Sequence, residues 1–214
     1  MKPRPRRYLL LAVACTSLFA LLAVLVEADT FIIRLDANLV RTLYSLGDER
    51  PTLQAFFVFV TDLGTGRPLW IVGALAVLLL LVSRQWFRAL VWLTGLLASE
   101  PVTAFLKAQF GRPRPPFATI DGFSFPSGHA FGSSVTYGML ALTILFVFRE
   151  HRWRWLLAGA LWLWMGLVAL SRPILGVHYP SDVLAGMSLG LGWGFAWAAL
   201  AEWRDLQKQI RHRN

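Results

Sequence analysis

Long apolar runs alternate with short charged segments along this chain. The first run, residues 8–26, contains no charged side chain and would span about 28 Å as a helix, close to the thickness of a bilayer's hydrocarbon core. Five more runs follow at residues 68–82, 89–105, 130–148, 155–170 and 183–201. The pattern predicts an all-α fold: a polytopic membrane helical bundle of about six transmembrane helices, with short interfacial helices.

The connection at residues 27–67 has a different pattern, because its apolar residues recur at helical spacing between polar ones. Two such stretches occur: Leu39, Leu43 and Leu46, then Leu53, Phe56, Phe57 and Val60. We predict two amphipathic helices on or in the outer membrane interface. Their apolar faces either border an entrance for lipid or pack as a lid on the bundle.

Composition favours a single integral membrane domain over residues 1–214. The chain is 56% hydrophobic and only 15% charged, whereas a soluble domain of this size needs more polar surface. Most of the Lys and Arg residues behind the formal charge of +9 flank apolar runs, so no basic face is left to bind nucleic acid. The single cysteine, Cys15, lies within the first run and is expected to pack as an apolar residue. No obligatory protein partner is evident.

The first run has one alternative interpretation, a cleaved signal peptide. Basic residues precede it, and Val26-Glu27-Ala28 faintly resembles a cleavage site. Its length of 19 residues exceeds the usual length of such regions, about 7–15 residues. We therefore predict a retained transmembrane helix.

Basic residues in the short connections predict the orientation. Four basic segments share one side of a six-span bundle: the N-terminus, the turns near residues 84–88 and 149–154, and the tail at 202–214. We place this side in the cytoplasm, with both termini, and predict a multi-pass protein of a bacterial inner membrane. The loops near 106–129 and 171–182 then face the periplasm, although they also carry basic residues. Cations kept on the less favoured side predict a function there.

Three cations near these loops could surround one phosphate group: Lys107, Arg114 and Arg172. Arginine suits this role because its planar fork binds two oxygens at once, while lysine acts as a point charge. Any one of them alone would be interpreted as an interfacial side chain reaching for water. The triplet from three regions of the chain favours an anion site.

Two short segments add chemistry to this charge. Pro126-Ser-Gly-His129 precedes an apolar run and reads as a helix start, where free N–H groups and the helix dipole attract anions. His178 precedes Asp182 by four residues, also at a helix start, so the carboxylate can reach back to one ring nitrogen. The other nitrogen would then be free to attack. A metal site is not predicted, because the sequence has no His-x-x-x-His pair with an acid, no acidic cluster and no cysteine ligand.

At these residues the chain resembles the type-2 phosphatidic acid phosphatase superfamily. The family pattern is Lys, six residues, Arg-Pro; then Pro-Ser-Gly-His; then Ser-Arg, five residues, His, three residues, Asp. All three blocks occur here in order. The resemblance extends over roughly residues 65–201. The spacings match between Lys107 and Arg114, between Arg172 and His178, and between His178 and Asp182.

The resemblance implies a role for each residue. His178 would be the nucleophile that forms a phosphohistidine, Asp182 would orient it, and His129 would protonate the leaving oxygen and then activate water. No metal or other cofactor would be needed. Arg112, in a second Arg-Pro pair out of register by two, and Glu100, inside the third apolar run, are treated as auxiliary. The phosphate would be held by Lys107, Arg114, Ser127, Gly128 and Arg172.

We therefore predict a lipid-phosphate phosphatase acting on the periplasmic face. Undecaprenyl diphosphate and phosphatidylglycerophosphate are the expected substrates, and phosphatidic acid is a third candidate. A lipid A phosphatase or phosphotransferase with the same site is the alternative enzyme. A vanadate haloperoxidase has a similar site, but the membrane spans argue against it. A non-catalytic lipid-binding membrane protein is the alternative from another class, and it has no need of the trio His178, Asp182 and His129.

Overall fold

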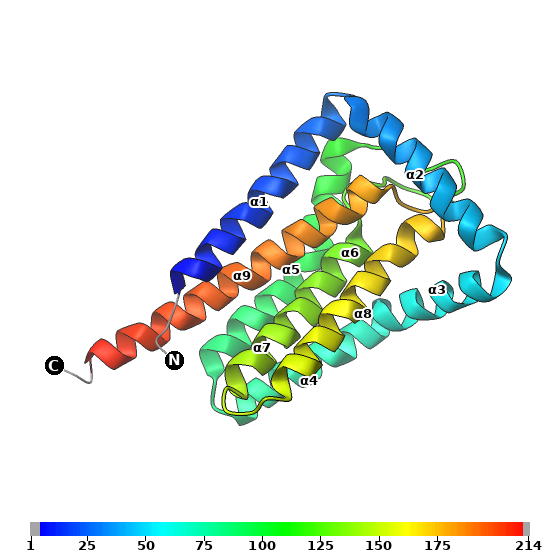
Figure 1. Ribbon diagram of the computed structural model, residues 1–214. Helices are drawn as coiled ribbons and strands as arrows, with labels where there is room; N and C mark the ends of the chain where they lie inside the picture. Colours follow the sequence, from blue (N-terminus) through cyan, green and yellow to red (C-terminus); the bar gives the residue numbers. More distant parts are fainter. Residues whose placement is uncertain (1–4, 212–214) are drawn as a thin grey trace.

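The computed structural model describes residues 5–211, and within this range it contains helices and no strand (Figure 1). The predicted basic positions Lys2, Arg4 and Arg213 lie outside the described residues. In chain order the elements are α1 (Pro5–Glu27), α2 (Phe31–Asp48), α3 (Pro51–Gly64), α4 (Gly66–Val82), α5 (Trp86–Phe110), α6 (Gly128–Ser133), the π-helix η1 (Ser134–Gly138), α7 (Met139–Val147), α8 (Arg154–Ile174) and α9 (Pro180–Arg211).

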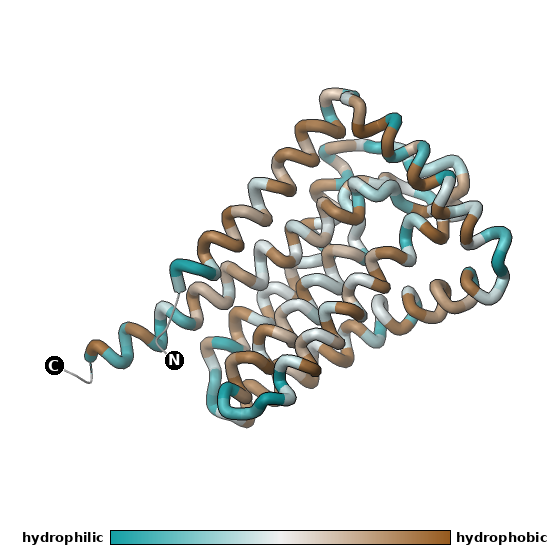
Figure 2. The backbone as a smooth tube through the Cα atoms, viewed as in Figure 1, coloured by the Kyte–Doolittle hydropathy of each residue, from teal (hydrophilic) through white to brown (hydrophobic). Residues whose placement is uncertain are grey.

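Five of these units are long and apolar enough to cross a membrane: α1, α5, the continuous stretch Gly128–Val147, α8 and α9. A sixth span is formed if α3 and α4, which meet at a bend of 41°, count as one. Figure 2 shows hydrophobic residues along most of the helices and hydrophilic residues at the turns. Many apolar side chains on the outer surfaces are exposed, as lipid-facing residues are; Leu156, for example, is 75% exposed. The predicted all-α membrane bundle is confirmed.

The helices run roughly lengthwise, so that their connections gather at two ends (Figure 1). The α4–α5 and α7–α8 turns lie at one end, which we call the turn end. The α5–α6 loop and the α8–α9 connection lie at the other, alongside α2. This arrangement brings the three motif segments to the same end of the bundle, although 75 residues separate Lys107 from Asp182 in the sequence.

Helix α9 is packed closely against α6, and two glycines make that approach feasible. A Cβ atom on Gly186 would lie 2.4 Å from the carbonyl oxygen of Ser127, and one on Gly190 would lie 2.8 Å from that of Phe131. Small residues four apart allow such close packing of membrane helices. At the top of this contact the backbone N–H of Ser127 donates to the carbonyl oxygen of Asp182 at 3.0 Å. The packing therefore holds the segment Pro126-Ser-Gly-His129 against the start of α9, which carries Asp182.

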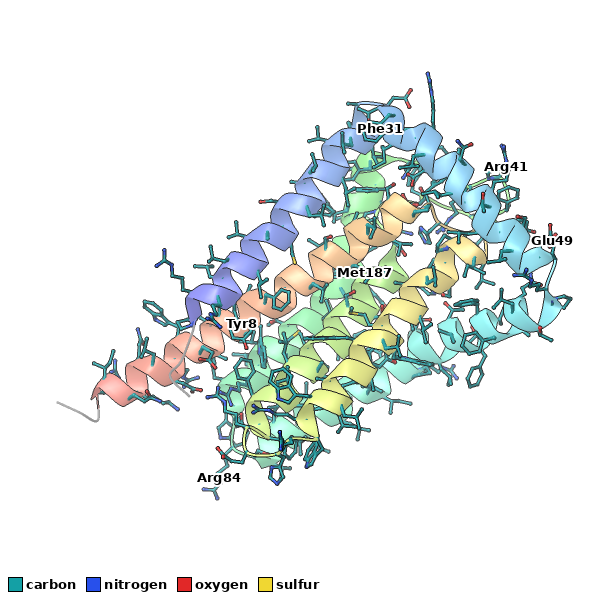
Figure 3. The ribbon with its side chains drawn as sticks, in the orientation of Figure 1. Tyr8, Phe31, Arg41, Glu49, Arg84 and Met187 are labelled. Carbon is teal, nitrogen blue, oxygen red and sulfur yellow. The ribbon has the colours of Figure 1, made fainter. Side chains whose placement is uncertain are left out.

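Two helices, α2 and α3, cover the segment in which the apolar spacing predicts two helices, but α3 forms a candidate span together with α4. On α2 the face that turns inward is made of Ile32, Asp36 and Val40, all buried. Its other face is open, where Leu39 is 41% exposed and Phe31 68% exposed (Figure 3). Helix α3 packs against α8 and continues, after the bend, into α4.

Candidate active site

His178 lies in the short connection between α8 and α9 and is only 2% exposed. Its Nε2 atom is 3.2 Å from Nη1 of Arg114, and its Nδ1 atom is 3.5 Å from Oδ2 of Asp182. A guanidinium can only donate, so Nε2 must accept and the ring proton belongs on Nδ1. The two ring nitrogens are thus divided between a cation and a carboxylate.

The surroundings of His178 also decide its charge. Burial lowers the pKa of this histidine to about 4, although the neighbouring Asp182 raises it. The positive charges of Arg172 and Lys107 lower the pKa of His178 further. The imidazole is therefore neutral at pH 7 and carries a lone pair on Nε2, as a nucleophile requires.

Asp182 lies in the first turn of α9 and is completely buried. Its Oδ2 atom accepts a hydrogen bond of 2.8 Å from the backbone N–H of Tyr179, and its Oδ1 atom accepts one of 2.5 Å from Nη1 of Arg112. The distance of 3.5 Å to His178 is long for a strong hydrogen bond. Such contacts shorten when substrate binds and the ring gains charge.

Arg114 is held in the loop after α5 by two backbone carbonyls. Its Nη1 donates to the carbonyl oxygen of Val177 at 2.8 Å, and its Nε donates to that of Asp121 at 3.3 Å. Burial lowers the pKa of the guanidinium, which Asp182 partly opposes. These bonds aim the fork at Nε2 of His178, where a transferring phosphoryl group would lie.

Arg172 lies in the last turn of α8, and only 5% of it is exposed. Its Nη1 donates to the hydroxyl of Thr61 on α3 at 2.8 Å. Its Nε is buried without a hydrogen-bond partner among the described residues. An unpaired buried donor is costly, so this atom is well suited to a ligand oxygen.

The second motif begins α6 and faces a cavity. Ser127 is the N-cap, and its hydroxyl accepts from the backbone N–H of Ala130 at 3.4 Å. The cavity measures about 390 Å³ and is open at the surface between α4 and α5, where Gly66 and Glu100 are exposed. Its walls include Leu69, Trp70, Glu100, Thr103, Lys107, Gly128 and His129.

The structure thus brings the predicted catalytic and phosphate-binding residues to one end of the bundle, and it gives Arg112 a different place. The two prongs of its guanidinium contact the carboxylates of Asp182 and Asp36. Asp36 was not predicted from the sequence. A signal was present, because Ile32 and Val40 lie four residues before and after it and mark the inward face of α2.

Within residues 5–211, no three His, Cys, Asp or Glu side chains are grouped closely enough to hold a metal ion. At one end of the membrane bundle a buried His–Asp pair lies beside converging cations, an arrangement suited to binding phosphate. The chain belongs to the PAP2 superfamily, whose profile matches residues 88–206, more than half of its length.

Two relatives of named function agree with this family. Phosphatidylglycerophosphatase B of Bacillus subtilis is 38% identical over 93 residues, which are 40% of this chain and 44% of that protein. The lipid A 4′-phosphatase of Bacteroides thetaiotaomicron is 31% identical over 166 residues, 67% of this chain and 70% of that protein. The protein is therefore placed among the membrane lipid-phosphate phosphatases.

A solved structure shares the fold. It is that of a transmembrane PAP2-type phosphatidylglycerolphosphate phosphatase from Bacillus subtilis, with a TM-score of 0.80 and 24% sequence identity. The match covers 90% of this chain and 96% of that one. The arrangement of the helices is thus common to both proteins.

Proposed function

We propose that the protein hydrolyses a lipid phosphate through a phosphohistidine on His178. The observation that carries the proposal is the division of the two ring nitrogens of His178. Nδ1 faces Asp182 and Nε2 faces Arg114, so the lone pair points to the place where a cation would hold the phosphoryl group. The cation beside Nε2 supports this role, because it could hold a phosphoryl oxygen next to the attacking nitrogen.

The reaction would proceed in two displacements. First, Nε2 of His178 attacks phosphorus, the bond from phosphorus to the leaving oxygen breaks, and His129 donates a proton to that oxygen. Then His129 removes a proton from water, the water oxygen attacks phosphorus, and the N–P bond breaks to release inorganic phosphate. Asp182 stabilises the positive charge that the ring of His178 gains in the first step.

Charge on the phosphoryl oxygens would be balanced by groups fixed before substrate arrives. Arg114 and Arg172 are held by protein hydrogen bonds, so they need little reorganisation during the reaction. The backbone of Gly128 at the start of α6 allows an oxygen to approach closely. Lys107, at the end of α5, completes the set from the wall of the cavity. In this scheme no metal ion takes part.

The cavity supports a lipid as the substrate. Its walls combine apolar side chains such as Leu69 and Trp70 with Lys107 and His129, and the cavity lies along α4 and α5 beside the start of α6. The phosphate of a lipid could then reach the end of the bundle that holds His178 and Asp182, which we call the catalytic end. The acyl or prenyl chains of the lipid would stay in the bilayer. Undecaprenyl diphosphate and phosphatidylglycerophosphate are the substrates we propose. Lipid A is the alternative, favoured by the relative from Bacteroides.

The decisive experiment is to trap the phosphoenzyme. Purified protein mixed with labelled lipid phosphate should form an acid-labile phosphohistidine, and His178→Ala should form none and show no turnover. His129→Ala should slow the cycle by about 10²–10⁴-fold, the usual effect of general acid–base catalysis. Phosphate release by His178→Ala at the wild-type rate would reject the mechanism. EDTA should leave activity unchanged; activity lost with EDTA and restored by metal would reject the metal-free scheme.

The proposed sidedness places the catalytic end in the periplasm and the turn end in the cytoplasm. Single cysteines at Thr119 and Ser83 test it in a Cys15→Ser background, because both positions are exposed and lie at opposite ends. An impermeant thiol reagent on intact spheroplasts should label position 119 and spare position 83. The reverse pattern would place the site in the cytoplasm and exclude lipids of the outer leaflet as substrates.

A further inference from the structure

Asp36 is a carboxylate enclosed in the protein, although it lies on a helix with an open outer face. It is 2% exposed. Placing an ionised carboxylate in such a site is costly unless charged or hydrogen-bonding groups compensate for the lost water. The partners of this side chain therefore indicate what it does.

Those partners belong to the neighbourhood of the catalytic pair. Oδ2 of Asp36 accepts a hydrogen bond of 2.8 Å from Nη2 of Arg112, and also one from the hydroxyl of Ser181. Oδ1 accepts a hydrogen bond of 3.0 Å from the backbone N–H of Ser181, in the first turn of α9. Asp36 thus binds a free N–H group at the start of the helix that carries Asp182, where the helix dipole favours negative charge.

Arg112 connects the two carboxylates. While its Nη2 contacts Asp36, its Nη1 donates to Oδ1 of Asp182 at 2.5 Å and to the hydroxyl of Ser181 at 2.8 Å. The guanidinium also lies over the ring of Tyr179, 4.2 Å from its centroid. A planar guanidinium held at both of its terminal nitrogens has one orientation. The position of Asp182 therefore depends on Asp36, which holds the other side of Arg112.

We propose that Asp36 is a positioning residue for catalysis, acting through Arg112 on Asp182 and so on His178. The inference rests on the proposed function, in which Asp182 orients the nucleophile. Asp36 would thus support the proposed catalytic residues His178, Asp182 and His129 from α2, a helix outside the three sequence motifs. Both prongs of Arg112 are engaged by carboxylates, and Asp36 is itself an anion, so neither residue should bind the phosphate directly.

This placement predicts a particular kinetic signature. Asp36→Asn keeps the shape of the side chain but removes its charge, so Arg112 loses its anchor and Asp182 loses its fixed position. We expect kcat to fall about 10- to 100-fold, the effect of a small misplacement of a catalytic group. KM and the inhibition constant of vanadate, a phosphate mimic, should stay within about two-fold of wild type, because the cations of the phosphate site are untouched.

Three further variants make the test specific. Asp36→Glu retains the charge and should recover part of the lost kcat. In an Arg112→Gln background, Asp36→Asn should cause little additional loss, because both changes break the same connection. Asp48→Asn removes an exposed carboxylate from the same helix and should match wild type. The melting temperature in detergent would be recorded for each protein.

Several results would overturn the inference. They are wild-type kcat for Asp36→Asn, equal losses for Asn and Glu, parallel changes in KM and vanadate inhibition, and additive losses with Arg112→Gln. Should Asp36→Asn fail to fold, Asp36→Glu decides: a lower kcat with unchanged vanadate inhibition supports the inference, and any other result overturns it. Failure of the proposed function is distinguishable, because His178→Ala would then remain active.

Discussion

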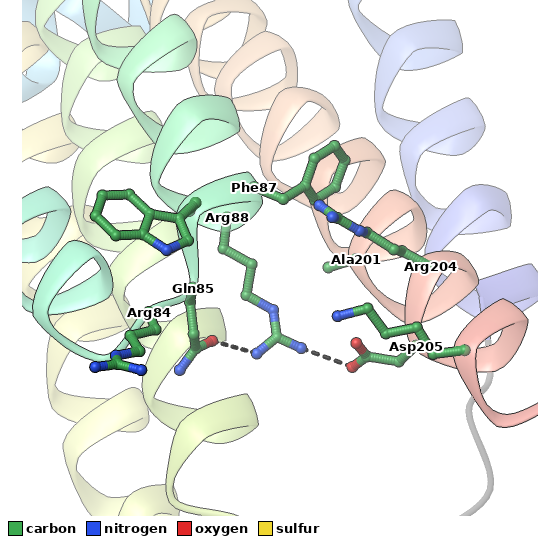
Figure 4. A pocket seen from close by; sticks show the side chains of 9 residues that line it. Arg84, Gln85, Phe87, Arg88, Ala201, Arg204 and Asp205 are labelled. Carbon is green, nitrogen blue, oxygen red and sulfur yellow. Dashed lines mark hydrogen bonds and ion pairs between the residues drawn. The ribbon is translucent and has the colours of Figure 1, made fainter. Parts of the chain in front are cut away.

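The two ends of the bundle both gather basic side chains, but only one of them, among the described residues, combines these with a buried His–Asp pair. At the turn end a cavity of about 260 Å³ lies between α5 and α9 (Figure 4). The nine residues drawn around it include no histidine. At the catalytic end the cations surround a buried His–Asp pair. The cationic residues that line the cavity at the turn end are Arg84, Arg88, Arg204 and Lys208.

The difference lies in how the arginines are used. At the turn end Arg88 donates to Gln85 and forms an ion pair of 2.7 Å with Asp205, whose side chain is 37% exposed. This pair joins α5 to α9 near water, where such contacts contribute little energy. At the catalytic end Arg172 is buried with an unpartnered Nε. The catalytic end is therefore not distinguished by the number of its cations. It is distinguished by the burial of its arginines, by an unpartnered donor and by a neutral histidine beside them.

The largest expected effect compares arginines at the two ends. Arg114→Lys retains positive charge but loses the fork that contacts Val177 and His178. It should lower kcat/KM about 10- to 100-fold and weaken inhibition by vanadate, because one of the donors aimed at the phosphoryl oxygens is lost. Arg88→Lys should leave both quantities close to wild type. Equal effects of the two substitutions on phosphate release would contradict the proposed distinction between the ends.

The second prediction concerns the packing that holds the catalytic end together. Gly186→Ala places a methyl group against the carbonyl oxygen of Ser127 and should separate α6 from α9. Overpacking of this kind costs about 1–3 kcal/mol, so we expect a lower melting temperature in detergent and lower activity. Gly159→Ala and Gly166→Ala are matched controls on α8, because a Cβ at either position meets no atom within 4 Å. A variant at Gly186 as stable as these controls would show that the close approach is not required.

The third prediction is a dependence of stability on pH that belongs to the catalytic end. The pKa of His178 is about 4 in the folded protein, and that of an unfolded histidine is about 6.5. Between these values the unfolded state binds the extra proton, so the contribution of His178 to stability is complete above about pH 6.5 and declines as the pH falls toward 4. His178→Gln should show a smaller decrease in melting temperature over that range. Parallel profiles for the two proteins would place the histidine in a more polar environment.

The smallest expected effect is on substrate choice. Glu100 is an exposed residue on the wall of the cavity, and a negative charge there should disfavour a second phosphate group. Glu100→Gln should therefore raise the ratio of kcat/KM for a lipid diphosphate over a lipid monophosphate by about 3- to 10-fold, a screened electrostatic effect. The comparison needs both lipids in the same detergent. An unchanged ratio would mean that Glu100 does not face the headgroup.

The sequence predicted the helices well, because membrane spans leave a strong and continuous apolar signal. It also predicted that His178, Asp182 and Lys107 lie on the same side of the membrane, because alternate connections of a helical bundle share one side. It did not predict the bend between α3 and α4. The sequence around Gly64 and Gly66 was interpreted as the end of an interfacial helix, whereas the structure continues there into a span.

Arg112 and Arg114 show where prediction from spacing stops. They are two residues apart in the same Pro-rich loop, and only the family pattern distinguished them. In the structure they face different partners, Arg114 toward His178 and Arg112 toward two carboxylates. The role of Arg112 depends on Asp36, 76 residues away in the chain. No local pattern in either segment records that pairing.

The cavity along α4 and α5, through which we propose that a lipid enters from the bilayer, has a kinetic consequence. A substrate that enters sideways arrives by diffusion within a two-dimensional fluid, and it is diluted by neighbouring lipids rather than by water. Its encounter frequency is set by its mole fraction in the bilayer or micelle. Adding inert detergent at constant total substrate would then slow the enzyme, as if the substrate itself had been removed.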